Sequence, residues 1–250
     1  MDAAAHAIER DRSESWGASA ECAARRLAAI TLAGALLGAL VGGVVGRLAM
    51  MLLAVLNPQA TGVVSDDGFS IGQFTLDGSL QLLGASTQFG LVGAAVYAAV
   101  RGLMTGPRWF QVLSISAGPA VVVGALLVHA DGVDFTVLQP VSLSIALFVA
   151  IPALYAGLLT VVAERWLRED HWFATARLPQ PLLPLLLWVV LAPLVPVIVV
   201  VWAAREWLLR QPRLRGALTA PVIPWVARAG LTAVFVLALV DLLADVSALS

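Results

Sequence analysis

The apolar run from Leu27 to Leu56 constrains the fold of this chain more than any other stretch, because glycine recurs in it at every fourth position. On a helix, residues four apart share one face, so these glycines form a smooth stripe against which a second backbone can pack closely. Such stripes are typical association surfaces in lipid, where the hydrophobic effect does not drive helices together. The sequence therefore predicts a membrane-spanning helix whose packing face consists of Gly34, Gly38, Gly42 and Gly46.

Arg47 follows the stripe directly and is the only charged residue in this apolar run. A charge at this depth costs roughly 2.5–3.5 kcal/mol on insertion scales. We therefore expect Arg47 to face protein or water and to have a partner. The alternative is that its long side chain only reaches the membrane surface, and the sequence leaves both interpretations open.

The composition of the chain excludes an ordinary soluble domain. Hydrophobic residues make up 60% of the sequence and charged residues 12%, whereas soluble domains carry about 25% charged residues. Further apolar runs of roughly twenty residues are long enough to cross a bilayer. The net charge of −1 gives no reason to expect nucleic acid as a partner, so the expected surroundings are the lipid bilayer.

The apolar runs predict an all-α polytopic bundle of about six transmembrane helices. Proline and turn residues separate the runs, and Pro152 is expected to interrupt the fourth one. We expect a polar N-terminal tail, a four-helix core, a linker, and a proline-rich fifth segment with a final helix. These regions are residues 1–26, 27–163, 164–180 and 181–250, and the six spans are about 27–56, 80–100, 110–130, 141–163, 181–201 and 225–244.

The distribution of charge predicts the orientation of the first four helices. Arginines gather in the N-terminal tail and in the second and fourth loops, whereas carboxylates gather in the first and third loops. The positive-inside rule therefore places the N-terminus in the cytoplasm. All 15 basic residues are arginine, which suggests a GC-rich bacterial genome and hence the bacterial inner membrane. Because lysine is absent, no Schiff base can form on this chain.

The first four helices also suggest two similar hairpins, residues 27–101 and 110–163. An Asp-Gly pair recurs after 64 positions, a Phe-Thr pair after 61 and a Trp-Phe pair after 63. Nearly equal spacings indicate a duplicated two-helix unit, which many transporters contain. The alternative is that the matches only reflect the turn chemistry that connecting loops share.

The topology of the C-terminal third is left open by the sequence. Residues 181–201 are long and apolar enough to cross, and we expect a crossing. A crossing would, however, put the four following arginines outside, against the positive-inside rule. A hairpin that folds back near Pro193 and Pro196 would return them to the cytoplasm. It would also bring Asp241 to the same outer half as Arg47. The four arginines are Arg205, Arg210, Arg213 and Arg215.

Carboxylates expected on the outer side are candidate partners for Arg47. Together they can line a polar pathway between the two hairpins. The alternative is that they are solvated loop residues that help the chain to turn. The residues considered are Arg47, Asp66, Asp67, Asp77, His129, Asp131, Asp134 and Asp241.

No cofactor, metal or enzymatic activity is predicted. His129, Asp131 and Asp134 have ligand chemistry, but one histidine without a second histidine or a cysteine nearby is a weak metal signal. Cys22 is the only cysteine. We find neither a nucleophile elbow nor a zinc-protease pair nor a phosphate-binding loop.

The sequence thus favours a small transporter-like or channel-like membrane protein. The alternative is a scaffold or regulatory subunit without transport activity, which would bind a second copy of itself or another membrane protein through the glycine stripe.

Overall fold

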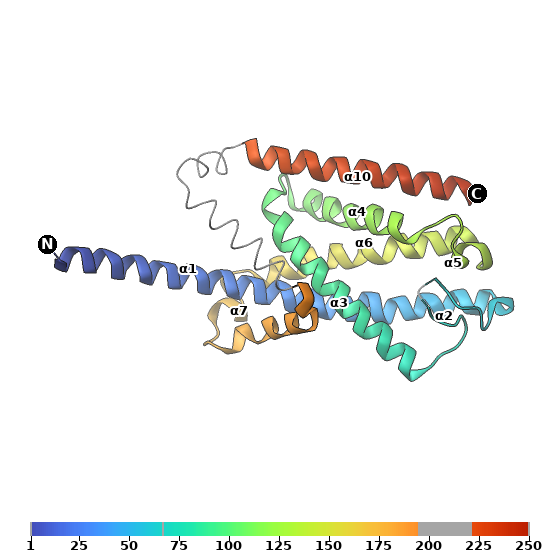
Figure 1. The fold of residues 1–250 in the computed structure, drawn as a ribbon, viewed down its shortest axis with the longest axis horizontal. Helices are drawn as coiled ribbons and strands as arrows, with labels where there is room; N and C mark the ends of the chain where they lie inside the picture. Colours follow the sequence, from blue (N-terminus) through green and yellow to red (C-terminus); the bar gives the residue numbers. More distant parts are fainter. Residues whose placement is uncertain (1, 67, 195–221, 250) are drawn as a thin grey trace.

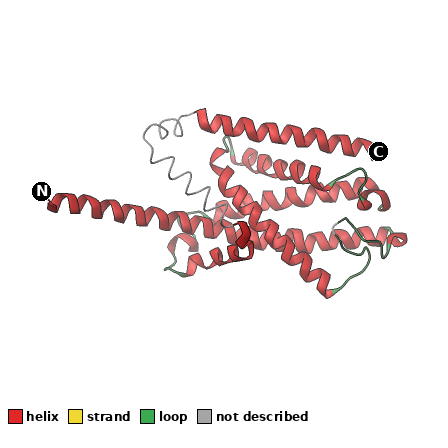
Figure 2. Ribbon diagram, viewed as in Figure 1, coloured by secondary structure: helices red, strands yellow, loops and turns green. Residues whose placement is uncertain are grey.

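A computed structural model describes residues 2–66, 68–194 and 222–249 of the chain. All regular secondary structure in these ranges is helical (Figures 1 and 2), and one isolated antiparallel bridge joins Val64 to Ser70. Five helical segments of the described chain are long and apolar enough to cross a membrane, which confirms the prediction of an all-α chain with several helices of spanning length. They are Ala20–Leu56, Leu76–Leu103, Arg108–Leu127, Val141–Trp166 and Val222–Ala248.

The first spanning segment is built from three consecutive elements without a break. These are α1 (Asp2–Leu37), the π-helix η1 (Gly38–Val45) and α2 (Gly46–Leu56). The N-terminal part of α1 extends beyond the other helices (Figure 1). The remaining elements are η2 (Pro58–Ala60), α3 (Leu76–Val100), η3 (Arg101–Leu103), α4 (Arg108–Leu127), α5 (Val133–Val137), α6 (Val141–Trp166), α7 (Trp172–Thr175), η4 (Gln180–Leu194) and α10 (Val222–Ala248).

Proline occurs both at the starts of helices and within them in the described chain. Pro107 and Pro140 occupy the N-cap positions of α4 and α6. The expected interruption at Pro152 is wrong, because α6 continues through it, as α4 does through Pro119. A proline removes one hydrogen bond of a helix, and neighbouring helices can support the backbone around the gap.

The two ends of the bundle carry opposite charge. At one end, Arg25 donates to backbone carbonyls of residues 173–176 and Arg101 pairs with Glu164. At the other end, Asp66 accepts from the backbone N–H of Asp134. We call these the basic end and the acidic end.

Helix α10 runs from the basic end to the acidic end. Near its start, Arg228 donates from Nε to the carbonyl oxygen of Leu103, at 2.8 Å. Near its finish, Asp245 accepts from the N–H of Ala130, at 3.3 Å. Since α6 ends at the basic end and α10 begins there, α10 runs parallel to α1 and α4 (Figure 1).

The expected sixth span over residues 181–201 lies partly outside the described residues. Residues 180–194 form the 3-10 helix η4, which packs along α1. The indole N–H of Trp188 donates to the Thr31 hydroxyl at 2.9 Å, well inside the first span. Residues 195–201 and the four arginines at 205–215 are not described. The described ranges therefore hold five segments of spanning length rather than six.

The glycine stripe lies against α3, whose small-residue row faces it. A Cβ added to Gly38 would lie 2.5 Å from the Ser86 carbonyl oxygen and 2.8 Å from the Gly90 Cα. One added to Gly34 would meet Ala94 and Gly90, and one added to Gly42 would meet Ser86. The two backbones approach too closely for any side chain between them.

Gly46 lies outside this interface, because nothing is within 4 Å of the place its Cβ would take. The π-helix explains part of the register. Glycines four apart advance slowly around an α-helix, which has 3.6 residues per turn. A π-helix forms its hydrogen bonds between residues five apart, so each turn holds more residues than in an α-helix. Residues four apart therefore shift around the axis of a π-helix in the opposite direction. The segment η1 therefore keeps Gly38 and Gly42 on the face that α3 covers.

Tyr155 of α6 completes the centre of the bundle. Its hydroxyl donates to the Gly90 carbonyl oxygen at 2.6 Å, and its ring covers Gly93. Helices α1, α3 and α6 thus meet at one point, with their polar groups hydrogen-bonded inside the bundle, as membrane helices require.

Candidate functional site: a cavity at the acidic end

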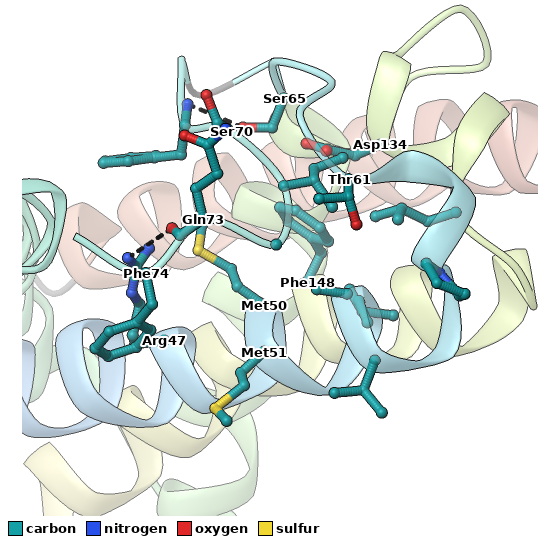
Figure 3. Close-up of a pocket in the computed structure, with 18 residues that line it drawn as sticks. Arg47, Met50, Met51, Thr61, Ser65, Ser70, Gln73, Phe74, Asp134 and Phe148 are labelled. Carbon is teal, nitrogen blue, oxygen red and sulfur yellow. Dashed lines mark hydrogen bonds between the residues drawn. The ribbon is translucent and has the colours of Figure 1, made fainter.

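A cavity of about 340 Å³ lies at the acidic end, between α2 and the loop that follows it (Figure 3). Its size falls at the lower end of the range for small-molecule sites, roughly 300–1,000 Å³. Helix α2 forms one wall, the loop covers it, and α5 and α6 contribute the rest. The lining residues are Arg47, Met50, Met51, Leu53, Ala54, Val55, Pro58, Thr61, Ser65, Phe69, Ser70, Ile71, Gly72, Gln73, Phe74, Asp134, Leu138 and Phe148.

The loop over the cavity folds back on itself as a small hairpin. The N–H of Gly62 donates to Ile71 O at 2.9 Å, and the N–H of Ile71 donates to Val63 O at 2.8 Å. Gly72 has φ +75°, a conformation that residues with a side chain rarely adopt. A Cβ there would also lie 3.1 Å from the Thr61 hydroxyl oxygen, so this turn requires glycine.

Asn57 fixes the position of the loop against the second hairpin. The residue is fully buried, and its amide nitrogen donates to Leu53 O and Gln139 O, both at 2.9 Å. Its amide oxygen accepts from the Gln139 N–H at 2.7 Å and from the Gln59 amide at 3.2 Å. The end of α2 is thereby joined to the start of α6, and both elements line the cavity.

Arg47 lies at one end of the cavity, next to the start of α3. Its Nη2 donates to the Gln73 carbonyl oxygen at 3.3 Å, and its guanidinium carbon lies 4.5 Å from the centre of the Phe74 ring. Its Nε is buried without a hydrogen-bond partner. Among the described residues, no carboxylate lies within ion-pair distance of this guanidinium. A buried donor left unpaired costs about 1–3 kcal/mol, so Arg47 is held in an unfavourable arrangement.

Asp134 is the candidate carboxylate that the structure brings to the same cavity. It lies across the cavity from Arg47 (Figure 3), is 5% exposed, and its N–H donates to the Asp66 carboxylate at 3.2 Å. Asp66 itself is exposed. Asp134 takes part in further interactions and is not a free acid.

The other candidate residues do not line the cavity. Asp77 is exposed in the first turn of α3, and Asp131 and His129 are exposed after α4. The His129 Nε2 lies 2.8 Å from the Leu126 carbonyl oxygen. Asp241 is exposed on α10, which packs against α4 instead of α2. Asp67 lies outside the described residues. No group of three His, Cys, Asp or Glu in the described chain is arranged to hold a metal.

A charged cluster at the basic end is a feature that the sequence reasoning missed. Oε1 of Glu164 accepts from the Tyr97 hydroxyl at 2.8 Å and from Nη2 and Nε of Arg101 at 2.8 and 3.1 Å. Tyr97 in the last turn of α3 and Arg101 at its C-cap are four apart in the sequence, and this spacing was the available signal. The cluster joins α3 to α6 at the end opposite the cavity.

Comparison with protein-family models, with curated proteins and with solved structures finds no match to this chain. The helices and the cavity therefore carry the functional argument by themselves.

Proposed function

We propose that this protein is a small transporter-like protein of the bacterial inner membrane, with five crossings and a cytoplasmic N-terminus. The cavity is its solute site on the outer side. The observation that carries the proposal is Arg47, a half-buried cation that lines a cavity and has no carboxylate partner in the described chain. Charges placed in this way within membrane proteins typically mark solute or ion pathways.

Two features, one at the centre of the bundle and one at the basic end, support a transport cycle. Close packing of Gly34, Gly38 and Gly90 closes the centre of the bundle below the cavity. The Tyr97–Arg101–Glu164 cluster joins α3 to α6 at the cytoplasmic side. A cavity open on one side with a closed opposite side is the arrangement that alternating access requires.

The alternative, a scaffold that associates through its glycine stripe, has less support. Gly34, Gly38 and Gly42 already face α3 of the same chain, so a partner helix would find only Gly46 uncovered. A second copy or another membrane protein would have to use a different face.

Loss of solute flux in the Arg47→Ala variant tests the proposal. We expect the purified protein in proteoliposomes to take up at least one labelled organic anion faster than empty liposomes. Arg47→Ala should slow this uptake at least tenfold, because the only cation of the cavity is removed. The matched control is Arg228→Ala, since Arg228 also lies over an aromatic ring, Trp225 at 4.9 Å, but outside the cavity. Uptake no faster than in empty liposomes, for every solute tried, would contradict the proposal.

Cysteine labelling tests the five-crossing topology. In a Cys22→Ser background, we expect Ser247→Cys to react with a membrane-impermeant maleimide on intact cells, because α10 ends at the acidic end. Thr105→Cys, in the loop at the basic end, should react only after permeabilisation. Both positions are exposed. Labelling of Ser247→Cys only in permeabilised cells would show that α10 runs in the opposite direction.

A further inference from the structure

The wall that the helices supply to the cavity is mainly apolar, whereas the loop adds the polar residues Thr61, Ser65 and Ser70. Met50, Leu53, Ile71, Leu138 and Phe148 contribute carbon and sulfur surface between Arg47 and Asp134. An inorganic anion or a fully polar solute would lose its hydration over this apolar surface without gaining hydrogen bonds there. The chemistry of the site therefore calls for a ligand with an apolar body and one charged end.

The charge of that end follows from Arg47, the cation that lines one end of the cavity. Its Nη2 donates to the Gln73 carbonyl oxygen, and its Nε has no hydrogen-bond partner. An anionic head is attracted to Arg47, and this attraction orients the ligand in the cavity. A guanidinium binds a carboxylate or a phosphate through parallel N–H donors.

Part of the apolar lining of the cavity is also exposed at the surface of the protein. Met51, Val55 and Phe74 line the cavity and are also 55%, 71% and 68% exposed. The apolar chain of a ligand can therefore reach the cavity across apolar surface.

Resting on the proposed function, we infer that the cavity binds an amphipathic anion, with its anionic head on Arg47 and a single apolar chain along Met50, Leu138 and Phe148. The volume sets the size of this ligand. At about 30 Å³ per non-hydrogen atom, the volume that a water molecule occupies in the liquid, the cavity holds on the order of ten atoms. A medium-length carboxylate such as decanoate fits this size. The acyl chain of an anionic phospholipid offers the same chemistry from the bilayer.

Equilibrium binding of radiolabelled decanoate to the full chain in nanodiscs tests the inference. In phosphatidylcholine nanodiscs we expect more decanoate to bind than in empty nanodiscs. Unlabelled decanoate should displace the bound label. Decanol, which lacks the anionic head, and acetate, which lacks the apolar chain, should not displace it. Arg47→Gln should weaken binding at least tenfold, and Arg228→Gln should leave it unchanged. Ala54→Phe, which fills the cavity, should abolish binding. Leu52→Phe is its control on the same helix, because Leu52 does not line the cavity.

Replacing part of the phosphatidylcholine with phosphatidylglycerol distinguishes the two sources of the ligand. Strong competition by phosphatidylglycerol identifies a bilayer lipid as the occupant, whereas unchanged decanoate binding identifies a free carboxylate. The inference would be overturned if the protein showed no specific binding of decanoate. It would also be overturned if Arg47→Gln bound decanoate as tightly as the unmodified protein, or if decanol displaced the label as well as decanoate does. Binding without flux would leave the inference standing and refute transport. Flux of another solute without decanoate binding would support transport and refute the inference.

Discussion

Gly38→Ala is expected to destabilise the protein by about 1–3 kcal/mol, the usual penalty for overpacking a tight interface. The added methyl group would lie 2.5 Å from the Ser86 carbonyl oxygen and 2.8 Å from the Gly90 Cα. Both are backbone atoms, which cannot move aside as the end of a flexible side chain can. Helices α1 and α3 would have to separate, and the contacts of Tyr155 with Gly90 and Gly93 would weaken with them.

Gly46→Ala is the matched control, because it makes the same change about two turns further along the helix. Nothing lies within 4 Å of the new methyl group, and alanine favours a helix over glycine by about 1 kcal/mol. We expect its melting temperature in detergent to equal or exceed that of the unmodified protein, while that of Gly38→Ala falls by several degrees. Equal melting temperatures for the two variants would show that the glycine face does not hold the bundle together.

Asn57→Ala is expected to lower the free energy of unfolding by about 2–4 kcal/mol, because it leaves several buried backbone groups without a partner. The N–H and the carbonyl oxygen of Gln139 both bond to the Asn57 amide, and Leu53 O accepts from it as well. The loop over the cavity would lose its attachment to α6. We therefore expect loss of decanoate binding together with the loss of stability.

Gln59→Ala controls for this variant, since Gln59 contributes only the 3.2 Å bond to the amide oxygen of Asn57. Its stability should change by less than about 0.5 kcal/mol, as for most surface substitutions. Unfolding monitored by titration with a denaturing detergent measures both variants. An Asn57→Ala protein as stable as Gln59→Ala would mean that the two hairpins are joined by other contacts.

The cavity assembles residues that are far apart in the sequence, which is why sequence reasoning identified only part of it. Arg47 and Asp134 were candidates because each is a charged residue near an apolar run. Asp77, Asp131, His129 and Asp241 had the same signal, yet they are exposed and do not line the cavity. The sequence pattern places a charge at one end of a helix but does not determine which neighbouring element covers it.

The expected sixth crossing over residues 181–201 stays a prediction, because residues 195–201 lie outside the described chain. Length and apolarity of residues 181–201 satisfy the requirement for a span, and hydropathy cannot distinguish a crossing from a segment that packs along another helix. The contact of Trp188 with Thr31 and the direction of α10, set by Arg228 and Asp245, are tertiary facts. They fix where residues 180–194 and α10 lie relative to the other described helices.

The sequence alone determined that the chain is helical, with several apolar segments long enough to span a membrane, because a backbone inside a bilayer must form its hydrogen bonds within each segment. It also determined that the helix with glycine at every fourth position can pack closely against the backbone of another helix. Only the tertiary structure decided which helix fills that place, that Gly46 is left uncovered, and that the loop after α2 folds back over Arg47. These features depend on packing between segments that are far apart in the sequence. A local residue pattern does not show which of those segments will be in contact.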